Sequence, residues 1–250
     1  IIDRIFEVEK PDIVIHGAAE SFVDYSLKDP NKFINANVLG TQNIINSSLK
    51  YGVKKLIYIS TDEVYGHLTG ESDESWTEES SLNPRNPYSA SKAAGELLVR
   101  AANQSHGLIY NITRSSNNYG PRQTPEKLIP KVIKCIMNKE PIPVYGQGMQ
   151  IRDWTHVYDN CAGIFAVLNK GEPNQVYNIS ANQEFTNIEV VHSICESMGE
   201  GHSLIEYIKD RYSINTDKIK ALGWKPEIFF KKHLYDLCIS WYENNKWFLK

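Results

Sequence analysis

The sequence predicts an α/β fold, with a parallel sheet covered by helices on both faces and a smaller lobe after it. Short apolar runs rich in β-branched residues alternate with helical patterns, as in a sheet that is buried on both sides. A chain of 250 residues is long enough for a large α/β domain with its own core. After about residue 120 prolines cluster and the elements shorten, which indicates the lobe.

The first 114 residues carry the clearest alternation. DIVIHG, KLIYIS and GLIYNITR are apolar and β-branched, and turn-forming residues bound them. The expected strands are 12–17, 55–60 and 107–114, and the expected helices are 31–51 and 88–106. Strand, helix and strand in this order predict a doubly wound sheet, in which ligands bind outside the carboxyl ends of the strands.

The second half of the chain reads as a lobe built from shorter elements. VYNIS at 176–180 predicts one more strand, and 229–248 predicts a closing amphipathic helix. We therefore expect a sheet domain over 1–120 and a lobe over 121–250, from which some segments return to the sheet. The acidic, turn-rich segment 67–87 is either a solvated loop or a surface insertion beside the site.

Composition excludes several classes of function. The net charge of −3 leaves no basic footprint, so we expect no nucleic-acid partner. Four scattered cysteines without a CxxC pair predict neither disulfides nor zinc, which fits a reducing, cytoplasmic compartment. No apolar run reaches the roughly 20 residues of a membrane span, and neither H-E-x-x-H nor G-x-S-x-G occurs. We expect no membrane and no metal.

Three polar residues follow the expected strand 55–60. Thr61, Asp62 and Glu63 fall where the sheet should present its ligand site. Carboxylates at the end of an apolar strand can be desolvated, which raises a pKa toward the value that a general acid needs. Two adjacent carboxyls can also separate into one acid and one base. The simpler alternative is a solubilising acidic turn.

YSASK places a tyrosine and a lysine four residues apart at the start of the expected helix 88–106. Residues at this spacing share a helix face, so the Lys92 ammonium should lie near the Tyr88 phenol and lower its pKa. The spacing alone is weak evidence, because Tyr/Lys pairs also occur at 51/55 and 242/246. The position of Tyr88, shortly after the Thr61 strand, distinguishes it from those pairs.

Four stretches together carry a resemblance to a known family: ISTDEVYG, NPYSASKAAGE, RSSNNYGPRQTPEKLIP and GQGMQIRDWTHVYD. They resemble the extended short-chain dehydrogenases/reductases, and among these the nucleotide-sugar 4,6-dehydratases, over essentially the whole chain. The resemblance implies a Rossmann-like doubly wound sheet with a C-terminal substrate-binding lobe, NAD as cofactor and a homodimer. It also implies dehydration of dTDP-glucose or UDP-glucose to the 4-keto-6-deoxy sugar, a step of deoxysugar and rhamnose biosynthesis.

The resemblance implies a role for each catalytic candidate. Tyr88, as phenolate, takes the proton of the sugar 4-hydroxyl, Lys92 supports it and holds the nicotinamide ribose, and Thr61 hydrogen-bonds the 4-oxygen. Glu63 removes the C5 proton, and Asp62 protonates the departing 6-hydroxyl. The Asp-Glu pair is the discriminating feature, because related epimerases and decarboxylases lack it.

Further positions resemble the binding residues of the family. The cofactor positions are Ala18, Ala19, Asn37, Ser60, Tyr88, Lys92 and Asn118. The substrate positions are Ser21, Thr61, Asn117, Glu126, Lys127, Leu128, Pro143, Tyr145, Arg152, Asn187 and Arg211. Structural alternatives stay open for several of them: close packing for the alanines, turn formation for the two asparagines, and a salt bridge from Arg152 to Asp153.

The chain departs from the family in three ways. No glycine-rich phosphate loop occurs, nor the acidic residue for the adenosine ribose, so we expect a preceding segment to be missing from this sequence. Several residues, including one more contact, are expected to be missing within 209–215. Phe22 stands where the family more often has histidine.

Three functions remain open from the residues alone. The first is the dehydratase, with the nucleotide undecided. The second is a 4-epimerase or a uronate decarboxylase, which would use Tyr88 and Lys92 without needing Asp62 as an acid. The third is a non-catalytic NAD-binding regulator, which the presence of every catalytic candidate disfavours.

Overall fold

A computed structural model describes residues 1–66, 75–207 and 217–243. The chain divides into two compact units. The sheet unit comprises Ile1–Ser115, Gly163–Ile179 and Thr216–Trp224, and the lobe unit comprises Ser116–Ala162, Ser180–Asn215 and Lys225–Lys250. Two segments from the second half of the chain therefore belong to the first unit.

The sheet unit is built on a four-stranded parallel sheet with the order β1-β2-β3-β7. The strands are β1 (Ile13–His16), β2 (Lys55–Thr61), β3 (Tyr110–Ser115) and β7 (Gln175–Ile179). Each lies within a few residues of a predicted strand. The predicted Rossmann-like doubly wound arrangement is confirmed.

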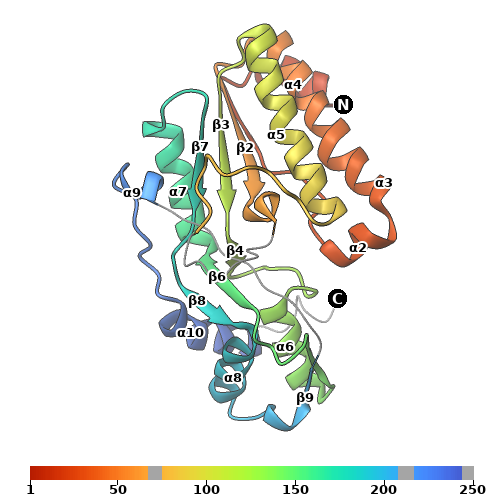
Figure 1. The fold of residues 1–250 in the computed structure, drawn as a ribbon, viewed down its shortest axis with the longest axis vertical. Coiled ribbons are helices and arrows are strands. Elements are labelled where there is room, and N and C mark those ends of the chain that lie inside the picture. The colour runs from red at the N-terminus through yellow and green to blue at the C-terminus, as the bar shows by residue number, and fades with distance from the viewer. Residues whose placement is uncertain (67–74, 208–216, 244–250) are drawn as a thin grey trace. The chain divides into compact units, whose positions relative to one another are not determined.

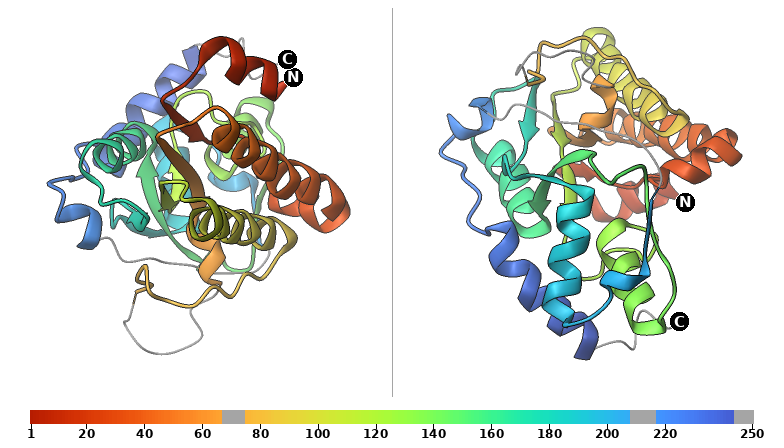
Figure 2. Two further views of the ribbon diagram at one scale, coloured as in Figure 1. Left: turned by 90° about the horizontal axis from the view of Figure 1, so that it is seen from above. Right: turned by 60° about the horizontal axis from the view of Figure 1, so that its bottom comes forward.

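Helices cover both faces of this sheet (Figure 1). On one face, α4 (Gly40–Lys50) and α5 (Pro87–His106) pack over Leu56, Tyr58 and Ile112. On the other, Val167 of α7 (Val157–Lys170) packs with Tyr177. Seen from above, α4 and α5 lie side by side (Figure 2). Apolar side chains point to both faces, which explains why the strands read as continuous apolar runs.

The predicted helix 31–51 forms in three parts. Asp29 caps α3 (Pro30–Phe33) by accepting from the Lys32 N–H at 3.3 Å, and proline occupies the first helical position. A π-helical segment, η1 (Ile34–Leu39), then leads into α4. Such wide turns are rare and are frequent near functional sites. Two shorter helices, α1 (Ile2–Glu9) and α2 (Val23–Lys28), precede this region.

The lobe unit combines two small sheets with three helices of at least eleven residues. β4 (Asn117–Tyr119) and β8 (Glu184–Thr186) flank β6 (Ile151–His156), and β5 (Ile142–Val144) pairs with β9 (Ile205–Tyr207). The helices are α6 (Leu128–Asn138), α8 (Asn187–Met198) and α10 (Phe230–Glu243), visible in Figure 2. Their buried faces form one core with Tyr119 and Trp154.

Several shorter elements complete the described chain. They are the 3₁₀ turns η2 (Asp62–Tyr65) and η3 (His202–Leu204), and α9 (Asp217–Lys220). The predicted closing helix is α10. Within the described residues, no helix is both long and apolar enough to cross a membrane.

Candidate active site

Parallel strands bring the polar ends of β1 and β2 to one edge of the sheet. His16 closes β1 and pairs in register with Tyr58 of β2, three residues before Thr61. Gly17, Ala18 and Ala19 follow β1 and are exposed. This edge is where a doubly wound sheet presents a ligand site.

The sequence Thr61-Asp62-Glu63 forms a cap and the first turn of η2. The Thr61 hydroxyl oxygen accepts from the Glu63 N–H at 3.3 Å and lies 3.2 Å from a carboxylate oxygen of Asp62. Thr61 and Asp62 are buried and Glu63 is half-buried. A simple solvated acidic turn would expose them, so the geometry supports the prediction of a site.

The end of η2 is fixed by a turn that only glycine fits. Gly66 has φ +84°, and a Cβ there would lie 2.3 Å from the Asn83 carbonyl oxygen. The Asn83 N–H in turn donates to the Val64 carbonyl at 2.8 Å. The close approach of these two backbone segments explains the Tyr-Gly step of the motif.

A buried ion pair lies beneath this turn. Arg114 of β3 and Glu96 of α5 are both almost fully buried, with Nη2 and Oε2 2.6 Å apart. Arg114 also donates to the Tyr65 hydroxyl at 2.8 Å, and Tyr65 donates to Asn178 at 2.6 Å. Reasoning from sequence missed this network, since its members come from four separate elements.

The described part of the acidic segment 67–87 packs on the sheet unit. The Trp76 ring stacks on Tyr65 with centroids 5.8 Å apart, and Glu78 accepts from the Asn178 N–H at 2.9 Å. Residues 67–74 lie outside the described part. From residue 75 onward, the alternative of a freely solvated loop is wrong, because these contacts hold the segment over β7.

The start of α5 delivers Tyr88 beside the carboxylates. Asn86 caps the helix and Pro87 occupies its first position. Desolvation raises the pKa of Tyr88 above its ordinary value, the negative charges of Glu63 and Asp62 raise it further, and a hydrogen bond with Thr61 opposes them. The expected lowering of the Tyr88 pKa by Lys92 is not found in this arrangement, in which the pKa is raised.

Lys92 is buried one turn further along α5. Its ammonium donates to the Ile59 carbonyl and lies 4.4 Å from the Tyr58 ring centroid. Burial lowers the pKa of Lys92 to about 8, with Glu96 opposing the shift. Because the ammonium is directed to β2, its effect on Tyr88 is weaker than the helical spacing alone predicts.

Asn37 ties the loop after β1 to α5. Its side-chain oxygen accepts from the Glu20 N–H at 2.8 Å, and its amide donates to the Glu20 carbonyl at 2.9 Å and the Ser91 hydroxyl at 2.8 Å. Asn37 is almost fully buried within η1. The structure thus shows it positioning the backbone near Ala19; cofactor contact stays a prediction.

His16 was not singled out by its sequence context. The ring nitrogen Nε2 lies 2.9 Å from the Thr41 hydroxyl. Burial and the nearby Lys92 charge lower the pKa of His16 to about 4, so the imidazole is neutral at pH 7. The sequence does hold a signal for His16: it stands at the carboxyl end of a predicted strand, directly before Gly-Ala-Ala, where a doubly wound sheet presents its ligand site.

Ser60 and the residues after Ala19 complete the predicted set in the sheet unit. The Ser60 hydroxyl is buried with no hydrogen-bond partner among the described residues, and a buried polar atom normally has one. Ser21 is exposed, and Phe22 is half-buried with its ring 5.2 Å from that of Tyr25.

The lobe unit holds the two predicted asparagines on β4. The Asn118 amide donates to the Ser116 carbonyl at 3.1 Å, and its side-chain oxygen is buried without a partner in the described chain. Asn117 is half-buried on the same strand. The turn alternative is wrong, because both residues pair in a strand with Trp154 and Thr155.

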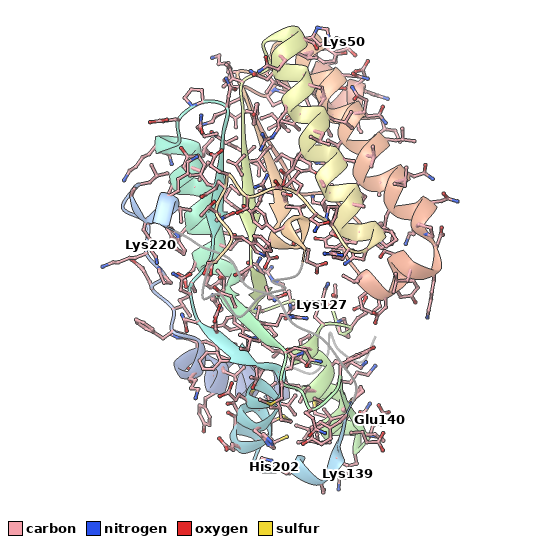
Figure 3. The ribbon with its side chains drawn as sticks, viewed as in Figure 1. Lys50, Lys127, Lys139, Glu140, His202 and Lys220 are labelled. Carbon is pink, nitrogen blue, oxygen red and sulfur yellow. The ribbon has the colours of Figure 1, made fainter. Side chains whose placement is uncertain are left out.

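Other predicted substrate residues lie at element ends of the lobe unit. Glu126 is exposed and precedes α6, Lys127 occupies the N-cap position of that helix without a side-chain capping bond (Figure 3), and half-buried Leu128 begins it. Pro143 is half-buried in β5, and Tyr145 follows it with 46% of its surface exposed.

Arg152 and Asp153 are neighbours on β6, so their side chains point to opposite faces. Asp153 accepts from the Ser180 hydroxyl and the Gln183 N–H, and burial raises its pKa to about 7. The alternative of an Arg152–Asp153 salt bridge is therefore disfavoured. Asn187 begins α8 and donates to Gln150 at 3.2 Å.

Arg211 and the segment 209–215 lie outside the described residues. The candidates in the described part of the chain thus form two groups. The sheet unit holds Thr61, Asp62, Glu63, Tyr88 and Lys92 with the residues after β1. The lobe unit holds most of the residues that are predicted to contact the nucleotide sugar. Within the described chain, no group of three or more His, Cys, Asp or Glu side chains could hold a metal.

Comparison with known proteins identifies the class. The family described as the NAD dependent epimerase/dehydratase family matches residues 1–180, and the chain belongs to that family. A dTDP-glucose 4,6-dehydratase of Streptomyces griseus is 42% identical over 94% of this chain and 73% of its own. The low-salt glycan biosynthesis protein Agl12 of Haloferax volcanii is 44% identical over 94% of this chain and 76% of its own.

A solved structure gives the same result. DesIV, a dTDP-glucose 4,6-dehydratase from Streptomyces venezuelae with NAD bound, superimposes with a TM-score of 0.93 at 37% identity, over 98% of this chain and 78% of DesIV. The predicted resemblance to the extended short-chain dehydrogenases/reductases and their 4,6-dehydratases is confirmed.

Proposed function

We propose that this protein is a hydro-lyase that removes water from a nucleotide-diphosphate glucose with NAD, giving the 4-keto-6-deoxy sugar. One observation carries the proposal: a hydroxyl, two carboxylates and a phenol converge at the end of β2, in a chain that resembles 4,6-dehydratases. Whether the nucleotide is dTDP or UDP is left to experiment, and the place in deoxysugar biosynthesis follows from the product.

The residues present fit NAD. The buried Ser60 hydroxyl, which has no hydrogen-bond partner among the described residues, and the small, exposed Ala18 and Ala19 offer polar contact and close approach at the sheet edge. Lys92 supplies a buried cation with a pKa of about 8 for the ribose hydroxyls. Asn118, with its unpartnered oxygen, is the candidate of the lobe unit. NAD held by these residues would supply the hydride acceptor for oxidation at C4 and the hydride donor for reduction at C6.

The protein's own side chains move the protons. Tyr88 accepts the proton of the 4-hydroxyl, with Thr61 holding the 4-oxygen, and a nearby positive charge is needed to offset the raised pKa of the phenol. The ketone at C4 acidifies the C5 hydrogen. Glu63 removes this hydrogen as general base, and Asp62, buried beside it, gives a proton to the 6-hydroxyl as water leaves. C5 takes up a proton again when C6 receives the hydride, which completes the 4-keto-6-deoxy sugar.

The predicted substrate residues occur in both units. Ser21 and Thr61 are the candidates of the sheet unit for contact with the sugar. The candidates of the lobe unit for contact with the nucleotide sugar are Asn117, Glu126, Lys127, Leu128, Pro143, Tyr145, Arg152, Asn187 and Arg211. The guanidinium of Arg152 suits phosphate oxygens because its planar fork makes paired hydrogen bonds.

A homodimer through the two long helices remains part of the proposal. The outer face of α5 presents Ala90, Ala94, Leu97 and Ala101, spaced four, three and four residues apart as in a helix-packing seam. Leu39 of η1 is also exposed, at 55%. Light scattering of the purified protein should give twice the chain mass. We also propose a cytoplasmic location, which the four free cysteines support.

Product mass tests the function directly. The purified protein, supplied with NAD, is incubated separately with dTDP-glucose, UDP-glucose and UDP-glucuronate. Loss of one water from one sugar supports the dehydratase and identifies the nucleotide. A galactose product of unchanged mass would favour the epimerase, and loss of carbon dioxide from UDP-glucuronate the decarboxylase. No change with any sugar would favour the binding protein.

A further inference from the structure

Asn86 connects the helix that carries Tyr88 and Lys92 to the carboxylate of Glu63. Its side-chain oxygen accepts from the Ser89 N–H at 2.8 Å, which caps α5. Its amide nitrogen donates to Glu63 Oε2 at 2.9 Å. The side-chain oxygen of Asn86 thus caps the start of α5, and its amide nitrogen holds the Glu63 carboxylate.

We propose that Asn86 is a positioning residue. It orients the Glu63 carboxylate for removal of the C5 proton and fixes the position of that carboxylate relative to Tyr88. The proposal rests on the proposed dehydratase function. It adds a residue outside the catalytic set, and it assigns that residue to one step of the reaction, the removal of the C5 proton.

The two hydrogen bonds of Asn86 depend on each other. The cap fixes the direction of the amide plane, because the Ser89 hydroxyl and the Asn86 N–H close the reciprocal half of the capping box at 3.2 Å. The amide donor is thereby aimed at Glu63 before any substrate binds. Holding a reacting group in place in advance removes an entropic cost from the chemical step.

Glu63 is then held at both ends. Its backbone N–H donates to the Thr61 hydroxyl at 3.3 Å, and Oε2 accepts from Asn86. These two contacts restrict the orientation of the Glu63 carboxylate before any substrate binds.

Asparagine is the residue that meets both requirements. Serine caps helices well, but its side chain is too short to cap Ser89 and reach Glu63 together. Aspartate is an equally good cap of nearly the same shape, yet it would place a second negative charge against Glu63. The charged or titratable groups already facing Glu63 are Asp62 of η2 and Tyr88 of α5, and neither is altered by changing Asn86.

Two variants separate positioning from capping. Asn86→Ser and Asn86→Asp both keep the cap, so their melting temperatures should stay near that of the wild type. Each step is then followed by itself, with C4 oxidation read from transient absorbance of reduced nicotinamide and C5 proton removal from hydrogen exchange with heavy water. We expect near-normal oxidation, with exchange slowed about 10-fold in Asn86→Ser and about 100-fold in Asn86→Asp.

The pH profile gives a second reading. In Asn86→Asp the added charge disfavours the ionised base, so the rate of exchange should reach half its maximum at a higher pH than in the wild type. Asn86→Ser should show a smaller displacement, and merely losing a helix cap would produce none.

Three outcomes would overturn the proposal. Exchange at the wild-type rate in both variants would show that Asn86 does not position Glu63. Equal slowing of oxidation and exchange, together with a lower melting temperature, would show that it only caps α5. Absence of dehydration by the wild type with any nucleotide glucose would overturn the proposed function itself, and the Asn86 assignment with it.

Discussion

Thr61, Asp62 and Glu63 sit in a turn that is held by Gly66, Asn83 and Asn86 and backed by a buried ion pair. The predicted nucleotide contacts Glu126 and Tyr145 instead extend, exposed, from ends of elements in the lobe unit. Groups that exchange protons must be placed within a fraction of an ångström, whereas a nucleotide can be bound by longer side chains that adjust. The contrast is between predicted catalytic residues held in a tight turn and predicted nucleotide contacts that are exposed at the ends of elements.

Neutralising both carboxylates should produce the largest effect. We expect Asp62→Asn with Glu63→Gln to slow water loss by about 1000-fold, because the acid and the base of the elimination are both gone. C4 oxidation should persist as a transient reduced-nicotinamide signal in stopped-flow absorbance. Full dehydration by the double variant would contradict both roles, and Lys92→Ala, which should slow oxidation itself, is the matched control.

Removing the charge of Glu96 should cost the sheet unit about 3 to 5 kcal/mol in free energy of unfolding, because Arg114 would remain buried without its partner. Urea denaturation of Glu96→Gln measures it. The exposed pair Lys54–Asp12 provides the control, and Asp12→Asn should unfold like the wild type. Similar midpoints for both variants would show that the buried pair does not stabilise the turn.

One buried group in each unit should make the free energy of unfolding depend on pH, and the two dependences should have opposite signs. The pKa of His16 is lowered from 6.5 to about 4, so between these values the unfolded chain binds more protons and stability falls as pH falls. The pKa of Asp153 is raised from 3.8 to about 7, so its contribution is lost as pH rises through that window. Each shift is worth roughly 3 to 4 kcal/mol across its full window.

Variant-minus-wild-type differences isolate the two groups. His16→Gln should lose less stability than the wild type when the pH falls from 6.5 to 4.5. Asp153→Asn should become more stable relative to the wild type when the pH rises from 5 to 7.5. Urea midpoints at each pH provide the numbers. Slopes of the same sign for both variants would refute the assignment.

Arg152→Ala should have the smallest of these effects and a different kinetic form. Loss of a diphosphate contact should raise KM about tenfold and leave kcat unchanged, because the interaction is the same in the ground and transition states. Steady-state kinetics with the preferred nucleotide glucose measure both constants. Lys131→Ala, an exposed lysine of α6, should change neither. A fall in kcat would place Arg152 in the chemistry and weaken the contrast between the units.

Much of the fold could be predicted because its signals are local. Strands buried on both faces must be apolar throughout, so β1, β2, β3 and β7 were visible as runs. The predicted start of the helix at 88 lies one residue after the start of α5 at Pro87, where a proline and the Asn86 cap are local signals. The π-helical turn at Ile34–Leu39 was missed, since its sequence is that of an ordinary helix.

By itself, the sequence determined which groups are available: a hydroxyl, two carboxylates and a phenol-lysine pair, each next to a strand or helix end. Spacing along one chain specifies such neighbours because backbone geometry is regular. Tertiary structure alone decided the electrostatics and the partners. It turned the Lys92 ammonium toward Ile59, raised the pKa of Tyr88, and joined Asn86 to Glu63, because burial and distant contacts set pKa values and orientations that no local pattern encodes.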